Sequence, residues 1–291
     1  MQSGKQAARR APQHKGDKFG RRRVAALLDQ LAGSGRGRRL VERLCEGGEA
    51  APLIAAEIAR SADFARLYKQ ARTLEIMPES GIEPVPALVG LAEFDDGLPF
   101  AAKFDRFFRP RLGRRGDGFA VIFDALNSLH PRPLIIETGC LRIPGNWEGD
   151  GQSSFMFDCL SRERGGTFVS IDIMPESIDT ARAACSSATH LICNDSVAAL
   201  HALSGIAKSP ASLLYLDSFD LDREDPMPSA IHHLLELTAG RPLIAPGTII
   251  CIDDYGIGDP PGGKGLLVDR FLSRIPSEVL HAGYQKVWLL K

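Results

Sequence analysis

Three aspartates of this chain stand where they could act together on a small ligand. Asp217 closes the apolar run LLYLDS, and the adjacent pair Asp253 and Asp254 closes the apolar run CIDDY. Carboxylates that lie close together and partly buried resist ionisation, so they need a counter-charge. Hard oxygen ligands suit Mg²⁺ or Mn²⁺, so these residues predict a divalent-metal site. The alternative is that each aspartate serves only a turn or a helix cap.

A glycine-rich loop is the second candidate site. It lies in segment 133–154, where the apolar run PLII leads through ETGCLRIPGNWEGDGQSS toward a helical pattern. Glycine has no Cβ, so backbone N–H groups and a helix N-terminus can approach a nucleotide-like ligand there. The loop glycines Gly139, Gly145, Gly149 and Gly151 do not follow the G-x-G-x-x-G spacing that seats a pyrophosphate. The loop therefore predicts a cofactor site and disfavours a nicotinamide dinucleotide.

Both candidate sites lie at the ends of apolar runs, and these runs indicate the fold. Buried parallel strands give continuous apolar runs, whereas helices repeat their apolar residues about every 3.6 positions. The predicted strands are 134–136, 167–173, 190–193, 212–216, 248–252, 278–281 and 286–290. The predicted helices are 153–162, 175–185, 197–206, 229–239 and 265–274. The turn between the last two strands is too short for a parallel crossover. We therefore predict an α/β fold with a doubly wound, seven-stranded sheet whose last strand is antiparallel.

The segments ETGC, GDGQSS, SIDIMP and CNDS resemble the cofactor motifs of class I S-adenosylmethionine (SAM) methyltransferases, a family with a Rossmann-like sheet. The resemblance spans residues 116–291 and implies that SAM is the cofactor. It places Glu137 and Gly139 near the methionine part of SAM and gives Asp172 the two ribose hydroxyls. Asp195 and Ser196 would lie at the adenine edge. The later part of the loop would contribute Gly151, Gln152 and Ser153.

The three aspartates resemble those of the branch that includes catechol O-methyltransferase and metal-dependent sugar methyltransferases. This resemblance implies that Asp217, Asp253 and Asp254 hold Mg²⁺ or Mn²⁺, which binds the acceptor oxygen and lowers its pKa. Such relatives place Lys or His three residues after the first aspartate as a general base, and this chain has Asp220 there. The candidate catalytic residues are Asp217, Asp220 and Lys264, the last from the loop PPGGKG.

The composition is that of a globular protein and does not select a reaction. The chain has 291 residues, a net charge of −1, and six scattered cysteines with no C-x-x-C pair. Such cysteines are typical of a reducing compartment. No apolar run approaches the ~20 residues of a membrane span, and the N-terminus lacks the apolar stretch of a secretory signal. We therefore expect a cytoplasmic enzyme without a membrane span.

The segment before the glycine-rich loop divides into two predicted regions. Residues 1–45 are a basic arm, with twelve Lys or Arg and three Asp or Glu up to Leu44. A solvated tail is the commonest role of such an arm, and few aromatics are present to stack on nucleic-acid bases. Residues 46–115 contain a predicted helix at 51–77 and the cluster FDRFFRPRLGRR, a candidate lid over the acceptor pocket. For Phe104 and Phe107 in this cluster we favour simple packing on the core.

Together these features predict a SAM-dependent methyltransferase acting on a hydroxyl of a small molecule or sugar, assisted by a divalent metal. Three alternatives stay open. They are a relative of the cephalosporin-hydroxylase-like group, a nicotinamide-dependent oxidoreductase, and a non-catalytic SAM-fold binding or scaffold protein. The absence of a Lys or His base at position 220 is the reason why the last of these stays open. The sequence leaves the acceptor open, as well as the formation of a homo-oligomer.

Overall fold

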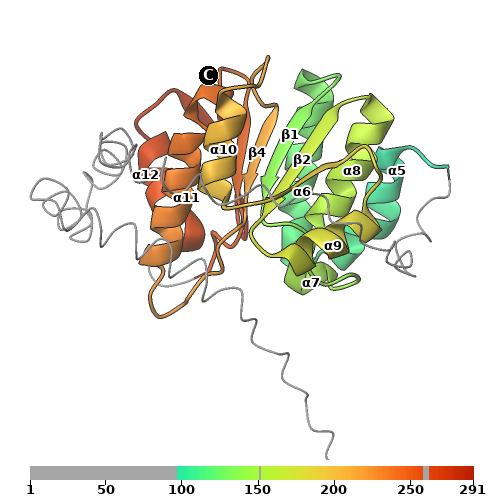
Figure 1. Cartoon of the computed structure of the whole chain (residues 1–291), viewed down its shortest axis with the longest axis horizontal. Helices are drawn as coiled ribbons and strands as arrows, with labels where there is room; N and C mark the ends of the chain where they lie inside the picture. Colours follow the sequence, from blue (N-terminus) through green and yellow to red (C-terminus); the bar gives the residue numbers. More distant parts are fainter. Residues whose placement is uncertain (1–96, 151, 258–261) are drawn as a thin grey trace, which may run out of the picture.

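A seven-stranded sheet between two layers of helices forms the centre of the molecule (Figure 1). The computed structural model describes residues 97–150, 152–257 and 262–291. The basic arm, the predicted helix at 51–77 and Gly151 lie outside the described residues.

The sheet has the strand order β3-β2-β1-β4-β5-β7-β6. Its strands are β1 (Leu134–Thr138), β2 (Thr167–Asp172), β3 (His190–Cys193), β4 (Leu213–Leu216), β5 (Ile249–Ile252), β6 (Ser277–Ala282) and β7 (Lys286–Leu290). Strands β1 to β5 are parallel, and β7 runs antiparallel to both β5 and β6. The predicted sheet is therefore confirmed. Its order reverses between β1 and β4, and open α/β sheets bind ligands beyond the carboxyl ends of the strands at such a point.

Helices cover both faces of this sheet (Figure 1). One layer is α10 (Ser196–Ser204), α11 (Met227–Ala239) and α12 (Leu266–Leu272). The other layer is α5 (Phe100–Lys103), α6 (Gly116–Leu129), α8 (Ser153–Arg164) and α9 (Pro175–Ala184). The remaining short helical segments are the π-helix η2 (Phe104–Phe108), the α-helix α7 (Trp147–Asp150), and the 3-10 helices η3 (Arg109–Arg111), η4 (Gly113–Arg115), η5 (Arg241–Leu243) and η6 (Gly263–Gly265).

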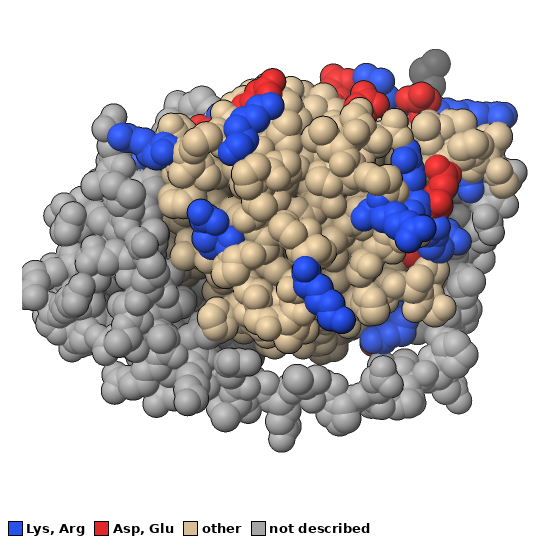
Figure 2. Space-filling model, turned by 90° about the horizontal axis from the view of Figure 1, so that it is seen from above, with Lys and Arg blue, Asp and Glu red and all other residues tan. Residues whose placement is uncertain are grey.

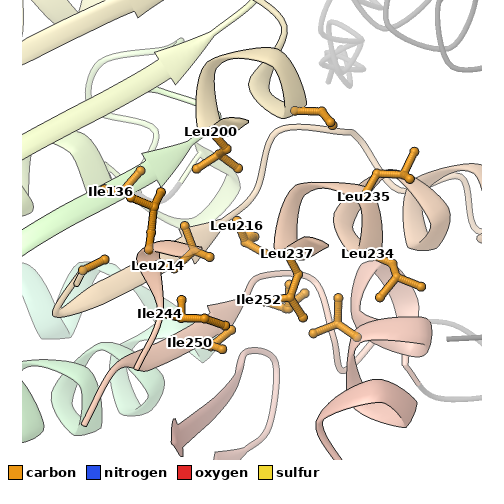
Figure 3. Close-up of a cluster of buried hydrophobic side chains, with 14 of the residues drawn as sticks. Ile136, Leu200, Leu214, Leu216, Leu234, Leu235, Leu237, Ile244, Ile250 and Ile252 are labelled. Atoms are coloured by element: carbon orange, nitrogen blue, oxygen red, sulfur yellow. The ribbon is translucent and has the colours of Figure 1, made fainter. Parts of the chain in front are cut away.

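Alternation along each strand divides the apolar side chains between two cores. In β4, Leu214 and Leu216 face α10, α11 and α12, and they belong to the same buried cluster as Leu237 of α11 (Figure 3). Leu213 and Tyr215 point to the opposite face and pack with the aromatic residues of α6 and α8. Because side chains of a strand alternate between the faces of its sheet, a strand buried on both faces must be apolar at every position. This explains why the parallel strands are continuous apolar runs in the sequence.

The segment before α6 packs in the same core as the sheet. The Phe123 ring of α6 lies 4.7 Å from that of Phe100 and 4.9 Å from that of Phe104, measured between ring centroids. Phe108 stacks on Trp147 at 5.4 Å. The expected packing of Phe104 on the core is confirmed, and Phe107 is partly buried against the same core. This packing extends across residue 116, where we predicted the methyltransferase domain to begin.

The outer surface carries charges of both signs. Figure 2 views the molecule from the side where the C-terminus lies in Figure 1, and its basic and acidic side chains are interspersed with uncharged surface among the described residues. Because β7 runs against the parallel strands, this side corresponds to their amino ends. No helix in the described ranges is long and apolar enough to cross a membrane.

Candidate functional site

A narrow cleft opens at the carboxyl ends of β1, β2 and β4, where the strand order reverses. Its lining residues are Gly139, Cys140, Arg142, Asp150, Ser153, Asp172, Asp217 and Ser218. The predicted cofactor residues Gly139, Ser153 and Asp172 are therefore brought together, and Asp217 of the acidic group borders the same space. This is the place where the fold is expected to bind a ligand.

Gly139 makes the sharp turn that brings the glycine-rich loop against β4. Its φ is +81°, and its N–H donates to the carbonyl oxygen of Ile171 at 2.8 Å. A Cβ at this position would lie 2.5 Å from the carbonyl oxygen of Asp217. Glycine is therefore required both for the backbone conformation and for the close approach of two strand ends.

The carboxylate of Asp172 is held at the end of β2 by two backbone groups. It accepts from the N–H of Cys140 at 3.1 Å and from the N–H of Met174 at 2.8 Å. Burial raises the pKa of Asp172, and these two hydrogen bonds oppose the shift. Each carboxylate oxygen can accept more than one hydrogen bond. The carboxylate can therefore also accept hydrogen bonds from hydroxyl groups in the cleft.

Glu137 lies beneath the loop and is fully buried. One of its oxygens accepts from the hydroxyls of Ser154 at 2.6 Å and Ser170 at 2.5 Å, while the other has no hydrogen-bond partner in the described structure. Burial raises the pKa of Glu137 to about 7. Ser154 in turn accepts from the N–H of Leu141 at 2.9 Å. Glu137 thus holds the loop against α8 and is not among the residues that line the cleft.

Gln152 closes the insertion in the loop with its own side chain. Its amide donates to the carbonyl oxygen of Ile143 at 2.9 Å and accepts from the N–H of Gly145 at 3.1 Å. Its backbone is in the left-handed region, with φ at +52°. These contacts support the shape of the loop, and the predicted contact between Gln152 and a cofactor stays a prediction.

Asp195 and Ser196, predicted at the adenine edge, follow β3 at the start of α10. The Asp195 carboxylate caps this helix by accepting from the N–H of Ala198 at 2.9 Å. The Ser196 hydroxyl lies 3.0 Å from Nε2 of His232 and donates to Ser218 at 3.4 Å. Ser218 lines the cleft, so Ser196 belongs to the layer of polar groups directly behind it.

The three predicted metal ligands meet at the carboxyl ends of β4 and β5, but protein cations face them. Asp253 is buried and accepts from Nε of Arg115 and from the Tyr215 hydroxyl, both at 2.8 Å. The ammonium of Lys264 lies 3.0 Å from a carboxylate oxygen of Asp254 and also donates to Asp217. The counter-charge that the sequence requires is thus supplied by one arginine and one lysine.

A divalent cation does not fit the acidic group in this arrangement. No group of three or more His, Cys, Asp or Glu within the described ranges could hold a metal ion. Lys264 lies between Asp217 and Asp254, while Asp253 is directed at Arg115. Hard cations such as Mg²⁺ need several oxygen ligands converging on one point. These oxygens converge on an ammonium and a guanidinium instead.

The charge states of Lys264 and Asp220 limit their use as general bases. Burial opposes the charge on Lys264, but Asp217 and Asp254 raise the pKa of this lysine above its ordinary value. Asp220 is also partly buried, yet the guanidinium of Arg142, at 3.0 Å, lowers its pKa. A protonated lysine cannot accept a proton, and a carboxylate with a lowered pKa is a weak base.

Sequence reasoning missed two arginines of this site. Arg115 belongs to the cluster FDRFFRPRLGRR, and nothing in that cluster distinguishes it from its exposed neighbours. Arg142 lies in the loop insertion, where it joins Asp150 at 2.9 Å to Asp220 at 3.0 Å. The only available signal was the unexplained surplus of acidic residues at the strand ends, which requires cations from elsewhere.

Comparison with solved structures finds methyltransferases with low similarity. The O-methyltransferase from Bacillus cereus in complex with SAH has a TM-score of 0.40 and 16% identity, over 60% of this chain and 81% of that one. The MycE methyltransferase from the mycinamycin biosynthetic pathway, in complex with Mg, SAH and mycinamycin VI, has a TM-score of 0.45 and 16% identity, over 67% and 54%. The calicheamicin methyltransferase CalS11 has a TM-score of 0.39 and 13% identity, over 100% and 99%.

No family model and no curated protein matches the sequence. The assignment of the fold therefore rests on the sheet itself. Its strand order, with β7 inserted antiparallel between β5 and β6, is the Rossmann-like arrangement of class I methyltransferases.

Proposed function

We propose that the protein is a SAM-dependent methyltransferase that transfers a methyl group to a hydroxyl oxygen of a small molecule or sugar. The observation that carries the proposal is the placement of Asp172 at the end of β2, in a cleft that it shares with Gly139 at the point where the strand order reverses. When bound, SAM supplies a methyl group on a positively charged sulfur.

Residues of the cleft can be matched to the parts of SAM. The Asp172 carboxylate would accept the two ribose hydroxyls, because its backbone contacts leave further acceptor positions. The turn at Gly139 would lie along the methionine part. Arg142 lines the same cleft, and its guanidinium suits a carboxylate such as that of the methionine part.

Asp217 is the remaining candidate for proton acceptor. It borders the cleft, and burial raises its pKa although Lys264 opposes the shift, whereas the pKa of Asp220 is lowered by Arg142 and Lys264 is protonated. The Asp217 carboxylate would accept the proton that the acceptor hydroxyl loses when the hydroxyl oxygen takes the methyl group. The carbon–sulfur bond to that methyl group would break at the same time, and SAH would be the leaving group. Positioning and a proton acceptor within reach are established sources of rate enhancement. Assistance by Mg²⁺ or Mn²⁺, which the sequence predicts, is not part of this proposal, because Lys264 lies between Asp217 and Asp254. Turnover should therefore persist in the presence of a chelator.

Calorimetric titration with SAM, SAH and NAD⁺ tests the proposed cofactor. We expect SAM and SAH to bind and NAD⁺ not to bind. Asp172→Ala should weaken SAM binding by roughly 1.5–3 kcal/mol, the scale of hydrogen bonds to a charged group. Asp179→Ala is a matched control, because Asp179 is an aspartate of α9 that pairs with Arg182 and does not line the cleft. Unchanged affinity in a folded Asp172→Ala protein would refute the assigned cofactor site.

An assay of methyl transfer distinguishes an enzyme from a non-catalytic scaffold protein. Transfer of a labelled methyl group from SAM to a panel of phenols, catechols and sugars should identify an acceptor, and Asp217→Asn should lower the rate. Tight SAM binding without transfer to any hydroxyl compound would favour the non-catalytic alternative. Binding of NAD⁺ in place of SAM would favour the oxidoreductase.

A further inference from the structure

Lys264 occupies an unusual position for a lysine. Its side chain is almost fully buried, with 2% exposed, although a buried ammonium is costly unless it is paired. Its partners are two carboxylates from different strand ends, Asp217 after β4 and Asp254 after β5. A third contact, at 3.5 Å, goes to the carbonyl oxygen of Asp217. The ammonium therefore joins the two strands at the edge of the cleft.

The glycines next to Lys264 allow its side chain to point into the protein. Gly263 has φ at +43°, and a Cβ there would lie 2.1 Å from the carbonyl oxygen of Asp254. Glycine alone permits η6 to lie this close to the end of β5. The glycines of PPGGKG thus place Lys264 between the aspartates rather than in solvent.

We infer that Lys264 is a built-in cation, whose ammonium takes the position between Asp217 and Asp254 that a divalent ion would otherwise fill, so that the wild-type protein binds no metal there. The inference concerns ion binding by these side chains and does not depend on SAM or on methyl transfer.

The balance of charge supports this inference. Asp217, Asp253 and Asp254 with Arg115 and Lys264 form a group of three carboxylates and two cations, which leaves one net negative charge. A divalent ion would meet an ammonium at contact distance and would make the group net positive. Without the lysine, three carboxylates and one arginine leave two net negative charges, which match Mg²⁺ or Mn²⁺. Removing Lys264 should therefore create a metal site.

Binding of Mn²⁺ tests the inference, by calorimetry and by the paramagnetic resonance signal of the free ion. The proteins compared are the wild type, Lys264→Ala, Lys264→Met, which retains most of the apolar stem, and Lys264→Ala combined with Asp254→Asn. We expect no specific binding by the wild type. Each single variant should bind one Mn²⁺ at least about 100-fold more tightly than the wild type, because a like charge at ~4 Å is removed from a site with an effective dielectric constant of about 20. The double variant should lose this gain.

Lys286→Ala is the matched control. Lys286 is also a largely buried lysine paired with a carboxylate, at 2.6 Å from Asp269, and within the described ranges it forms an ion pair with that one carboxylate only. Its removal should not create a Mn²⁺ site, because one carboxylate does not supply the ligands of a hard cation. Melting curves and circular dichroism verify that each variant is folded.

Two results would overturn the inference. The first is specific Mn²⁺ binding by the wild-type protein that Asp254→Asn abolishes. The second is a folded Lys264→Ala or Lys264→Met protein that gains no Mn²⁺ affinity, or gains no more than Lys286→Ala. If both Lys264 variants fail to fold, the wild-type titration decides the question by itself. Because no arm of this experiment contains SAM or an acceptor, failure of the proposed methyl transfer would leave its result unchanged.

Discussion

Replacing Arg115 by methionine should strongly destabilise the protein. Arg115 has 5% of its side chain exposed and Asp253 has 1%, and the two are joined at 2.8 Å. Methionine fills a similar volume but leaves Asp253 buried with the Tyr215 hydroxyl as its one side-chain donor among the residues that the structure describes. Removing one partner of a buried ion pair costs about 3–5 kcal/mol, because the other charge stays buried without compensation. For a domain of this size that corresponds to a melting temperature lower by about 6–20 °C.

Arg109→Met is the control for this prediction. Arg109 forms the same type of contact, with Asp117 at 2.9 Å, but the two side chains are 47% and 76% exposed. Exposed ion pairs contribute about 0–1 kcal/mol. Urea unfolding of both variants, followed by circular dichroism, gives the two free energies of unfolding on one scale.

A second substitution separates loss of charge pairing from loss of packing. In the double variant Arg115→Met with Asp253→Asn the buried charge is gone, so it should be more stable than Arg115→Met alone. If Arg115→Met is no more destabilising than Arg109→Met, or if Asp253→Asn gives no recovery, the assignment of Arg115 as the counter-charge of Asp253 is refuted.

Three further predictions address the loops, the pH dependence and the arm. Gly145→Ala should cost about 1–3 kcal/mol of the free energy of unfolding, because residue 145 has a positive φ. Gly263→Ala should cost more, because φ is positive there too and, of the two positions, an added Cβ at 263 would also meet a backbone atom. Equal losses in urea unfolding would contradict this. Burial raises the pKa of Glu137 from 4.5 to about 7, so as pH rises through this window Glu137 loses its proton first in the unfolded chain, and the folded state is destabilised. The free energy of unfolding of Glu137→Gln should therefore rise relative to that of the wild type by up to about 3 kcal/mol between pH 4.5 and 7. A pH-independent difference would show that Glu137 titrates normally. Removing residues 1–45 should leave the melting temperature and SAM affinity nearly unchanged, since charge effects are screened beyond about 10 Å at 0.1 M salt; loss of folding would show that this segment packs on the domain.

The sheet could be predicted because its strands are buried on both faces. A strand such as β4 sends Leu213 to one core and Leu214 to the other, so every position is apolar and the run is visible without an alignment. The short turn between β6 and β7 fixed their antiparallel pairing in the same way. The helix α6 was not predicted, although Phe119, Ile122, Phe123 and Leu126 repeat at helical spacing and are all buried.

The acidic residues could be placed together, but their partners could not be found. Carboxyl ends of adjacent parallel strands share one edge of the sheet, so Asp217 and Asp253 must be neighbours. The identity of the counter-charge depends on contacts between distant segments. Arg115 is 138 residues from Asp253 in the sequence, and Lys264 reaches Asp217 only because η6 lies against the end of β5. Neither contact can be predicted from residues that are close together in the sequence. A metal ion was therefore the simplest counter-charge that the residue types suggested.

The pairing of Arg115 with Asp253 also links the opening dynamics of two distant parts of the chain. If the start of α6 detached while β5 stayed in the sheet, a buried carboxylate would lose its counter-charge, so such partial opening is strongly disfavoured. Segments that cannot open separately exchange their amide hydrogens in one cooperative unit. The first turns of α6 should thus resist hydrogen exchange almost as long as the central strands, unlike an ordinary helix near the edge of a domain.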